Sequence, residues 1–439
     1  MVLRSKPLCR HVLRNQQKIV HFLQRQIRLC STGSARPLEK IVDYDEHIKM
    51  IEIPESAYQT QSHNVEHDRD TGYLFKADDM SVRLAAPHQL QLKPDADALS
   101  FGKTFTDHML KAFWHKSLGG WQRPEITPME NLVIHPAAKV LHYAIELFEG
   151  MKAYRGVDGR IRLFRPNMNM NRMNLSAKRS GLPTFEGDEF IKCIQRLVSI
   201  DQEWVPHTET ASLYIRPTLI GIDPTLGVAS SDSALLYTIL SPVGGYFNTD
   251  SSSRAVSLLA DPRFTRAWPG GVGDRKMGSN YGPTIHVQKE AASKGLQQVL
   301  WLYGPDHEVT EVGTMNIFML FINEDGEREL ITPPLNGLIL PGITRDSILA
   351  LAQQWSYKVT EGRITMPEVC KLIQEERLLE MFGAGTACTV SPIERINYLG
   401  TDLFIPTIEQ EKPIFERIYK TLAAIQYGKI EHPWAVAID

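Results

Sequence analysis

The sequence predicts a mixed α/β protein of two domains, and three observations lead to this prediction. The chain has 439 residues, which is too long for one ordinary hydrophobic core. Its apolar content of 43% and charged content of 23% are close to globular averages, so most of the chain should fold. Strand-like and helix-like segments lie on both sides of a Gly- and Ser-rich break at 244–253, which is the best domain boundary in the sequence.

The first 38 residues differ in composition from the rest. They contain eight Lys or Arg residues and no acid, interleaved with apolar side chains. This pattern is typical of a mitochondrial transit peptide and lacks the continuous apolar stretch of a secretory signal. A nucleic-acid arm and a membrane-surface helix are the alternatives. Without the segment, 40 of the 48 basic residues remain, against 51 acidic ones, which gives a net charge of −11. This charge disfavours a nucleic-acid partner.

The remaining chain divides into four parts. Residues 39–72 are polar and aperiodic, and we expect a linker or extension there. A smaller α/β domain is expected at 73–247, an interdomain loop at 248–254 and a larger domain at 255–439. In the smaller domain, strands are predicted at Leu213–Pro217 and Ala234–Leu240, with the turn-rich loop Gly221–Val228 between them.

The larger domain repeats the mixture of strands and helices. Strands are predicted at Ala255–Ala260, Gln298–Tyr303 and Met315–Phe321, and a helix at Thr284–Lys294. A second helix opens within Pro341–Ser347 and continues through Ala352. Its opening presents unpaired backbone N–H groups beside a threonine, which makes a good phosphate cradle, although most helix N-termini bind only water.

Lys276 is the first candidate for chemistry. It lies in the segment 269–283, which has too many glycines for an ordinary helix or central strand and is expected to form a loop against a ligand. A desolvated amine there is free to form an imine with an aldehyde, and pyridoxal phosphate is the aldehyde cofactor that proteins use in this way. Taken alone, the segment is more simply an exposed basic turn.

Glu311 strengthens this interpretation. It lies in the segment Thr310–Phe318, which places a carboxylate and a hydroxyl at the mouth of an apolar strand. An acid beside a pyridine nitrogen keeps the ring protonated and electron-withdrawing. Together the two segments favour a pyridoxal phosphate site.

Several long motifs carry a family resemblance from about Tyr73 onward. These stretches, the two segments above among them, resemble the branched-chain amino-acid aminotransferases of pyridoxal phosphate fold type IV, the fold of D-amino-acid aminotransferase, and the mitochondrial form most. The further motifs are Phe101–Met109, Leu147–Lys152, Arg162–Pro166 and Phe382–Cys388.

The resemblance implies a cofactor at the domain interface. Lys276 carries pyridoxal phosphate as an imine and moves the Cα proton of the amino acid, while 2-oxoglutarate takes the amino group in the second half-reaction. Taken alone, Arg172 would be a surface ion-pair residue and Tyr281 a core residue. The implied cofactor contacts are Glu311 at the pyridine nitrogen, Tyr281 at the phenolic oxygen, and Arg172, Thr314, Ile343, Thr344 and Thr386 around the phosphate.

The resemblance also implies an apolar substrate pocket with one polar end. Arg216 with Tyr143 receives the distal carboxylate of glutamate, and Val228 comes from the neighbouring subunit of a homodimer. The turn that contains Thr386 and Ala387 offers N–H groups to the α-carboxylate. Taken alone, aromatic residues at such positions are more often plain core. The implied aromatic lining is Phe101, Tyr143, Phe148, Tyr214 and Tyr246.

Two alternatives stay open. Another fold type IV enzyme, such as a D-amino-acid aminotransferase or a pyridoxal phosphate lyase, would share Lys276 and Glu311 but not the aromatic pocket. A silent binding or scaffold protein has no reason to retain the complete set. No apolar run approaches the ~18 residues of a membrane helix, so no membrane association is expected.

The cysteines predict a reducing compartment, in keeping with a mitochondrial matrix location. All five are widely scattered, which suggests neither a disulfide framework nor a zinc site. The resemblance adds a departure: where mammalian members carry a redox-active Cys-x-x-Cys, this sequence has Cys388 and Ser391. A disulfide switch at this position is therefore not expected.

Overall fold

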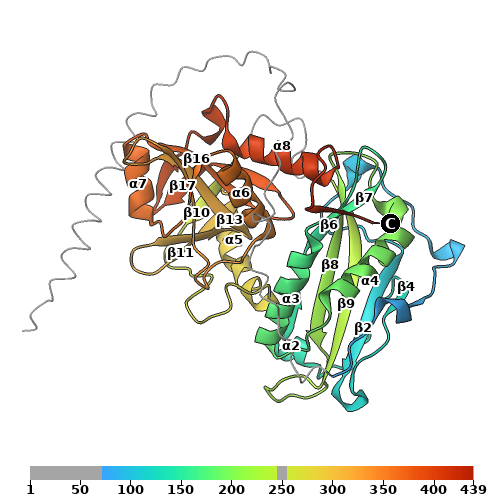
Figure 1. Cartoon of the computed structure of the whole chain (residues 1–439). Coiled ribbons are helices and arrows are strands. Elements are labelled where there is room, and N and C mark those ends of the chain that lie inside the picture. The colour runs from blue at the N-terminus through green and yellow to red at the C-terminus, as the bar shows by residue number, and fades with distance from the viewer. Residues whose placement is uncertain (1–71, 245–254, 439) are drawn as a thin grey trace, which may run out of the picture.

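The computed structural model describes residues 72–244 and 255–438, which form two lobes that are each built on a β-sheet. In Figure 1 the first lobe runs from blue to green and the second from yellow to red. The mixed α/β architecture predicted from the sequence is confirmed. The predicted transit peptide at 1–38, the extension at 39–72 except its last residue, and the interdomain loop at 248–254 lie outside the described residues. Tyr246 also lies outside them.

Within the described residues the first sheet has ten strands. Their order is β1 (Ser81–Val82), β4 (Glu125–Pro128), β2 (His108–His115), β9 (Ser233–Val243), β8 (Ser212–Gly221), β6 (Met151–Arg155), β7 (Ile161–Phe164) and β19 (Ala435–Ala437). Beside this path, β3 (Gly120–Trp121) pairs with β2, and β5 (Glu146–Phe148) pairs with β8. The helices of this lobe are α2 (Lys139–Tyr143), α3 (Pro166–Ser180) and α4 (Gly187–Ile200).

The two longer helices follow from local sequence signals. α3 has Pro166 at its first position and ends before Gly181, whose positive φ of 65° closes the helix. α4 buries Phe190, Ile194 and Leu197 at helical spacing against the first sheet, with polar side chains on its other face. Both helices lie over the same face of the sheet in Figure 1.

Pro217 marks an interruption in the first sheet. It lies inside β8, where a proline has no N–H to donate to a neighbouring strand. On that side β5 ends at Phe148 and β6 begins at Met151, so the strand edge is broken at Glu149 and Gly150. The Glu149 N–H donates to the Pro217 carbonyl at 2.8 Å. This break frees the Glu149 side chain from the strand pattern.

The second sheet has nine strands within the described residues. Their order is β12 (Glu308–Val312), β11 (Gln298–Tyr303), β10 (Val256–Ala260), β17 (Val390–Tyr398), β16 (Leu378–Ala384), β13 (Met315–Ile322), β14 (Arg328–Thr332) and β15 (Lys358–Glu361), with β18 (Thr401–Phe404) paired to β17. The helices of this lobe are α5 (Thr284–Ser293), α6 (Ile343–Gln354), α7 (Met366–Gln374) and α8 (Ile414–Gln426).

The elements predicted from the sequence are present. The two predicted strands of the first lobe are parts of β8 and β9, and those of the second lobe match β10, β11 and β13. The helices predicted from Thr284 and from within Pro341–Ser347 are α5 and α6. β8 continues to Gly221, so the predicted turn-rich loop begins one residue later than expected.

The lobes share one apolar cluster. It joins Tyr154 and Phe164 of the first sheet to Phe318 and Phe382 of the second, and it includes Ile418 of α8. α8 contacts β16 and β17 as well as β7, so it packs on both sheets. Arg165 adds a polar tie, because its guanidinium contacts the Ser347 hydroxyl at 2.7 Å in α6.

β19 departs from the predicted domain boundaries. The prediction gives all of 255–439 to the second domain, whereas Ala435–Ala437 pairs antiparallel with β7 of the first sheet. The C-terminal segment returns across the first lobe in Figure 1. The pairing with β7 reaches a chain segment that is too distant for local sequence patterns to reveal. The other domain boundaries stay a prediction. No helix of the described residues has the length and apolarity to cross a membrane.

Candidate active site

Lys276 lies in the loop between β10 and α5, and both of its backbone polar groups bond to the first lobe. Its N–H donates to the Ser176 hydroxyl of α3 at 3.0 Å, and its carbonyl accepts from the Phe148 N–H at 3.0 Å. Asn280 braces the loop from inside by donating to the carbonyls of Val272 and Arg275, each at 2.7 Å. Lys276 is therefore fixed where the two lobes meet.

Gly278 lies two residues after this lysine and against the first sheet. A Cβ at Gly278 would displace the carboxylate of Glu146 in β5. The absence of a side chain at position 278 thus lets the Glu146 carboxylate lie against the loop.

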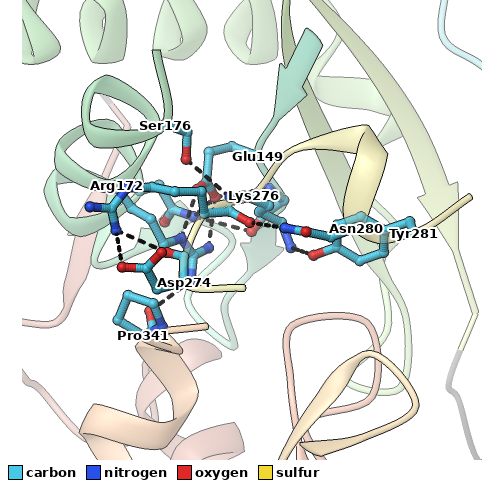
Figure 2. A network of polar contacts seen from close by, with 11 residues as sticks. Glu149, Arg172, Ser176, Asp274, Lys276, Asn280, Tyr281 and Pro341 are labelled. Atoms are coloured by element: carbon cyan, nitrogen blue, oxygen red, sulfur yellow. Dashed lines mark hydrogen bonds and ion pairs between the residues drawn. The ribbon is translucent and has the colours of Figure 1, made fainter. Parts of the chain in front are cut away.

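Aromatic rings surround the Lys276 amine. Its Nζ lies 3.3 Å from the Tyr281 hydroxyl, 5.0 Å from the centre of the Phe148 ring and 5.4 Å from that of Tyr281. Figure 2 shows the amine pointing toward Tyr281, with Glu149 and Arg172 beside it. The predicted neighbours Tyr281 and Phe148 are thus brought to the lysine.

Arg172 forms a buried ion pair with Glu149. Nε and Nη2 of the guanidinium donate to the two carboxylate oxygens at 2.7 and 2.8 Å, and Asn169 donates to the same carboxylate at 2.8 Å. Burial alone raises the pKa of Glu149, but the guanidinium outweighs it and holds the pKa below its ordinary value. The remaining nitrogen, Nη1, donates to the Pro341 carbonyl at 3.0 Å, just before α6.

Glu311 is buried in β12 and bonded on both oxygens. Its Oε1 accepts the Leu340 N–H at 2.7 Å, and its Oε2 lies 3.2 Å from the Arg266 guanidinium. Burial raises the pKa of Glu311, while Arg266 opposes that shift. Leu340 and Pro341 are neighbours in sequence, so Glu311 and Arg172 both reach the entrance of α6.

The N-terminus of α6 faces the turn between β16 and β17. The helix begins at Ile343, and the Thr344 hydroxyl donates to the Gly385 carbonyl at 3.2 Å. Thr386 and Ala387 follow in that turn. Thr314 is exposed at the two-residue turn between β12 and β13, where Gly313 has a positive φ of 57°. The predicted phosphate residues thus come from α3, α6 and two turns of the second sheet.

Three of the predicted substrate residues form one group with Phe148. Arg216 lies over the Phe148 ring at 4.6 Å and donates to the Tyr214 hydroxyl at 3.0 Å. Phe101 meets Tyr214 edge to face, with ring centres 5.0 Å apart. The Arg216 Nε is buried and has no hydrogen-bond partner among the described residues, so it remains available to an acceptor.

Tyr143 and Val228 lie apart from this group, on the loop 222–232 and the helix beside it. Tyr143 ends α2 and its hydroxyl donates to the Leu226 carbonyl. Val228 is 83% exposed at the tip of the loop. Lys139 holds the base of the loop, because its Nζ lies 2.8 Å from the Asp223 carboxylate and 2.7 Å from the Ser230 carbonyl.

Sequence reasoning missed Glu149 and Arg266. Each is the buried partner of a predicted residue, and each lies far in sequence from that partner. Glu149 lies within the motif Leu147–Lys152. In the sequence, its role was indicated only by the position of an acid directly after apolar residues. The sequence carries no comparable signal for Arg266.

Cys388 is buried at the turn after Thr386. Its Sγ donates to the Val390 carbonyl at 3.4 Å, and the Ser391 hydroxyl also lies against it. Burial raises the pKa of the Cys388 thiol to about 12. Cys370 lies in α7, and its thiol is also free.

These residues fit pyridoxal phosphate by their chemistry. An amine, a phenol, a carboxyl group, a guanidinium and a helix N-terminus converge from both lobes, and these groups suit an aldehyde, a phenolic oxygen, a pyridine nitrogen and a phosphate. In the part of the chain that the structure describes, no cluster of His, Cys, Asp or Glu is arranged to hold a metal ion.

Comparison with known proteins identifies the family of the chain. Residues 146–396 match the model of amino-transferase class IV. The cytosolic branched-chain-amino-acid aminotransferase of Mus musculus is 55% identical over 365 residues, covering 83% of this chain and 94% of the relative. The mitochondrial one of Mus musculus is 53% identical over 362 residues, covering 82% and 91%.

A solved structure extends the comparison to the fold. The branched-chain amino acid aminotransferase of Thermobaculum terrenum in its PLP form is 20% identical and has a TM-score of 0.57, covering 75% of this chain and 98% of that one. The fold is thus that of pyridoxal phosphate fold type IV. The sequence match covers most of this chain and nearly all of each mouse relative. The chain belongs to the class IV aminotransferases, in the family of the branched-chain-amino-acid aminotransferases.

Proposed function

We infer that the chain catalyses the transfer of the amino group from leucine, isoleucine or valine to 2-oxoglutarate, with pyridoxal phosphate as its cofactor. The products are branched-chain 2-oxo acids and L-glutamate. The observation that carries this inference is Lys276, whose backbone is bonded to the first lobe and whose amine lies beside Tyr281, within the field of Glu149 and Glu311. Family membership supports the same reaction.

The residues of the second lobe and of α3 are assigned to cofactor binding and proton transfer. When bound, pyridoxal phosphate withdraws electrons from the Cα of the amino acid and so lets it lose a proton. Lys276 would attach the cofactor and then act as the general base for the Cα proton. Glu311 would hold the pyridine nitrogen and Tyr281 the phenolic oxygen. The phosphate would be held by Arg172, Thr314, Thr386 and the N-terminus of α6 at Ile343 and Thr344.

The first lobe selects the substrate. Phe101, Phe148 and Tyr214 supply apolar surface for a branched side chain, and Tyr246 is proposed to complete it. Arg216 gives the pocket its polar end, because its buried Nε lacks a partner among the described residues and can bind the distal carboxylate of glutamate. This arrangement explains how one pocket accepts both leucine and glutamate.

The assembly proposed for this enzyme is a homodimer. Val228 is highly exposed and lies on a loop held at its base by Lys139 and at its tip by Tyr143. A firmly held loop with an apolar tip is suited to complete the substrate pocket of a second copy. Tyr143, whose hydroxyl donates to the Leu226 carbonyl of this loop, is proposed to receive the distal carboxylate of glutamate together with Arg216 of its own chain.

The location proposed for this enzyme is the mitochondrial matrix. The basic segment 1–38 supports it. The cytosolic and mitochondrial mouse relatives match at similar identity, so the relatives favour neither compartment.

A panel of amino acids and 2-oxo acids with the purified chain tests the function. We expect turnover with the three branched-chain L-amino acids and 2-oxoglutarate, and a visible absorption band of the bound cofactor that is lost on adding leucine. Turnover with D-amino acids alone would indicate a different fold type IV enzyme. A stable absorption band without turnover would indicate a silent binding protein.

A further inference from the structure

Lys152 is a buried lysine at the active site that the proposed reaction does not use. It lies in β6, is 9% exposed, and donates from Nζ to the Ala387 carbonyl at 3.0 Å. Ala387 belongs to the turn assigned to the substrate α-carboxylate. The bond joins the first lobe to the second, so Lys152 contacts this turn from the first sheet.

The strand register places Lys152 among the substrate residues. In β6 it lies directly opposite Tyr214 of β8. Residues opposite each other in antiparallel strands project from the same face of the sheet. Tyr214 in turn contacts Phe101 and Arg216. The ammonium group therefore lies on the face of the first sheet that carries the predicted pocket.

The charge of Lys152 lacks a partner of opposite sign. An ammonium group has three donors, and a backbone carbonyl accepts one of them. Among the described residues, no carboxylate forms an ion pair with Lys152. Burial lowers its pKa to about 8, and the neighbouring Cys388, with a thiol pKa raised to about 12, is neutral at physiological pH. A buried, uncompensated cation is costly unless an anion arrives to balance it.

We propose that Lys152 is a positioning residue for the substrate α-carboxylate: its ammonium group holds the turn 385–387 through the Ala387 carbonyl and supplies the positive charge that the bound carboxylate balances. This inference rests on the proposed function. It assigns the selection of substrates with a free carboxylate to a side chain of the first lobe, in addition to the backbone N–H groups of the turn.

The test compares two ligands with the same carbon skeleton, one anionic and one neutral. 4-Methylpentanoate has the carbon skeleton of leucine without the amino group, and 4-methylpentanamide is its neutral amide. Calorimetric affinities of both for the holoenzyme are measured in the wild type and in Lys152→Met, Lys152→Gln and Lys152→Arg. Lys111→Met serves as the matched control, because Lys111 is also buried in the first sheet but pairs with Glu125.

We expect Lys152→Met and Lys152→Gln to weaken binding of the acid at least about tenfold, as for loss of a charged hydrogen-bonding group, and to leave the amide within about twofold. Lys152→Arg should retain most of the preference for the acid, and Lys111→Met all of it. With leucine, the Met and Gln variants should raise KM more than they lower kcat. Lys152→Gln keeps a donor for Ala387, so it carries the test if the Met variant fails to fold.

Equal weakening of acid and amide would overturn the proposal, because Lys152 would then be only a structural tie. Unchanged affinity for the acid would overturn it as well. Failure of the proposed function would look different, since the wild type would not turn over leucine in the first place. Because the affinities are measured by calorimetry, they do not depend on turnover.

Discussion

The position of Lys276 is fixed by its backbone hydrogen bonds to neighbouring residues, not by its side chain. Around it, two buried ion pairs join residues distant in sequence, Glu149 with Arg172 and Arg266 with Glu311. Removing one member of such a pair leaves an uncompensated buried charge, at a cost of about 3–5 kcal/mol. Substitutions at these positions therefore change stability as well as chemistry, and each test needs a measure of folding beside the measure of rate.

Lys276→Ala should abolish turnover and leave the fold intact. The amine supplies both the attachment of the cofactor and the movement of the proton, whereas the contacts that fix the loop come from the backbone of residue 276. Steady-state rates with leucine and 2-oxoglutarate, together with a thermal melt, check this. Lys289→Ala in α5 is the control, because Lys289 is exposed. A variant that keeps a tenth of the wild-type rate would contradict the assignment.

Glu311→Gln should retain the cofactor and lower the rate by roughly 10²-fold or more. An uncharged partner leaves the pyridine nitrogen less protonated, so the ring attracts electrons less strongly. The substitution also leaves the charge of Arg266 unbalanced, so we expect a lower melting temperature. Absorbance measures how much cofactor is retained, and single-turnover rates measure the chemical step. Together they separate slower chemistry from loss of stability. Unchanged kinetics would mean that another group serves the ring nitrogen.

Cys388 should not form an intramolecular disulfide under mild peroxide. Its thiol is buried, its raised pKa keeps it protonated, and Ser391 stands where a second thiol would be needed. We expect Ser391→Cys to gain a disulfide and lose activity reversibly, because the residue 391 side chain already lies against the Cys388 thiol. Mass spectrometry of oxidised, unreduced protein decides this. A peptide linking Cys388 to another cysteine of the wild-type chain, with activity restored by dithiothreitol, would refute the prediction.

At the scale of elements, a buried lysine joins the two ends of the loop 222–230. Lys139 is 3% exposed and joins both ends of the loop through Asp223 and Ser230. The neighbouring ammonium group lowers the pKa of Asp223. Lys139 thus joins the base of the loop, while the Tyr143 hydroxyl holds its tip through the Leu226 carbonyl.

Lys139→Met should loosen this loop without unfolding the sheet. Loss of the charged hydrogen bonds should speed amide hydrogen exchange at 222–230 by roughly tenfold or more, while β8 and β9 keep their protection. Asp223→Asn should give a smaller effect in the same direction, and Lys289→Met none. Unaltered exchange in the loop of Lys139→Met would show that other contacts hold it.

The elements predicted from sequence were those with strong local signals. β9, β10 and β11 are apolar runs, and α6 directly follows Pro341 and Gly342. The break at Glu149 and Gly150 escaped prediction, because it depends on Pro217 in a strand more than sixty residues later. Lys152 escaped for a similar reason. Its partner is a backbone carbonyl, which leaves no trace in the pattern of side chains.

For the whole molecule, the family resemblance predicted a cofactor site between the two domains, which the periodicity of apolar residues could not predict. Local patterns predicted a mixed α/β chain, but the joining of the lobes through α8 and a shared apolar cluster is a property of distant segments. The return of β19 to the first sheet is a further case, since a strand of three residues with one exposed side chain carries almost no signal.

The chain should be a dimer at assay concentrations. Exposed apolar side chains gather on and near α2 and the loop after β8, among them Val133, Leu141, Leu226 and Val228. Sedimentation and activity measured together across nanomolar to micromolar concentrations check the prediction. Val228→Asp should weaken both association and turnover, whereas Val157→Asp, at another exposed valine, should leave both unchanged. A fully active monomer at nanomolar concentration would contradict a shared site.

The pairing of β19 with β7 has a consequence for biosynthesis. A ribosome releases the chain in order, so β7 emerges more than 250 residues before the strand that covers its edge. Until then the edge of the first sheet is open, and the nascent lobe presents unpaired N–H and C=O groups to other chains. The first lobe therefore cannot complete its sheet during its own synthesis, and a chaperone that shields this edge would act until Ala435–Ala437 has been translated.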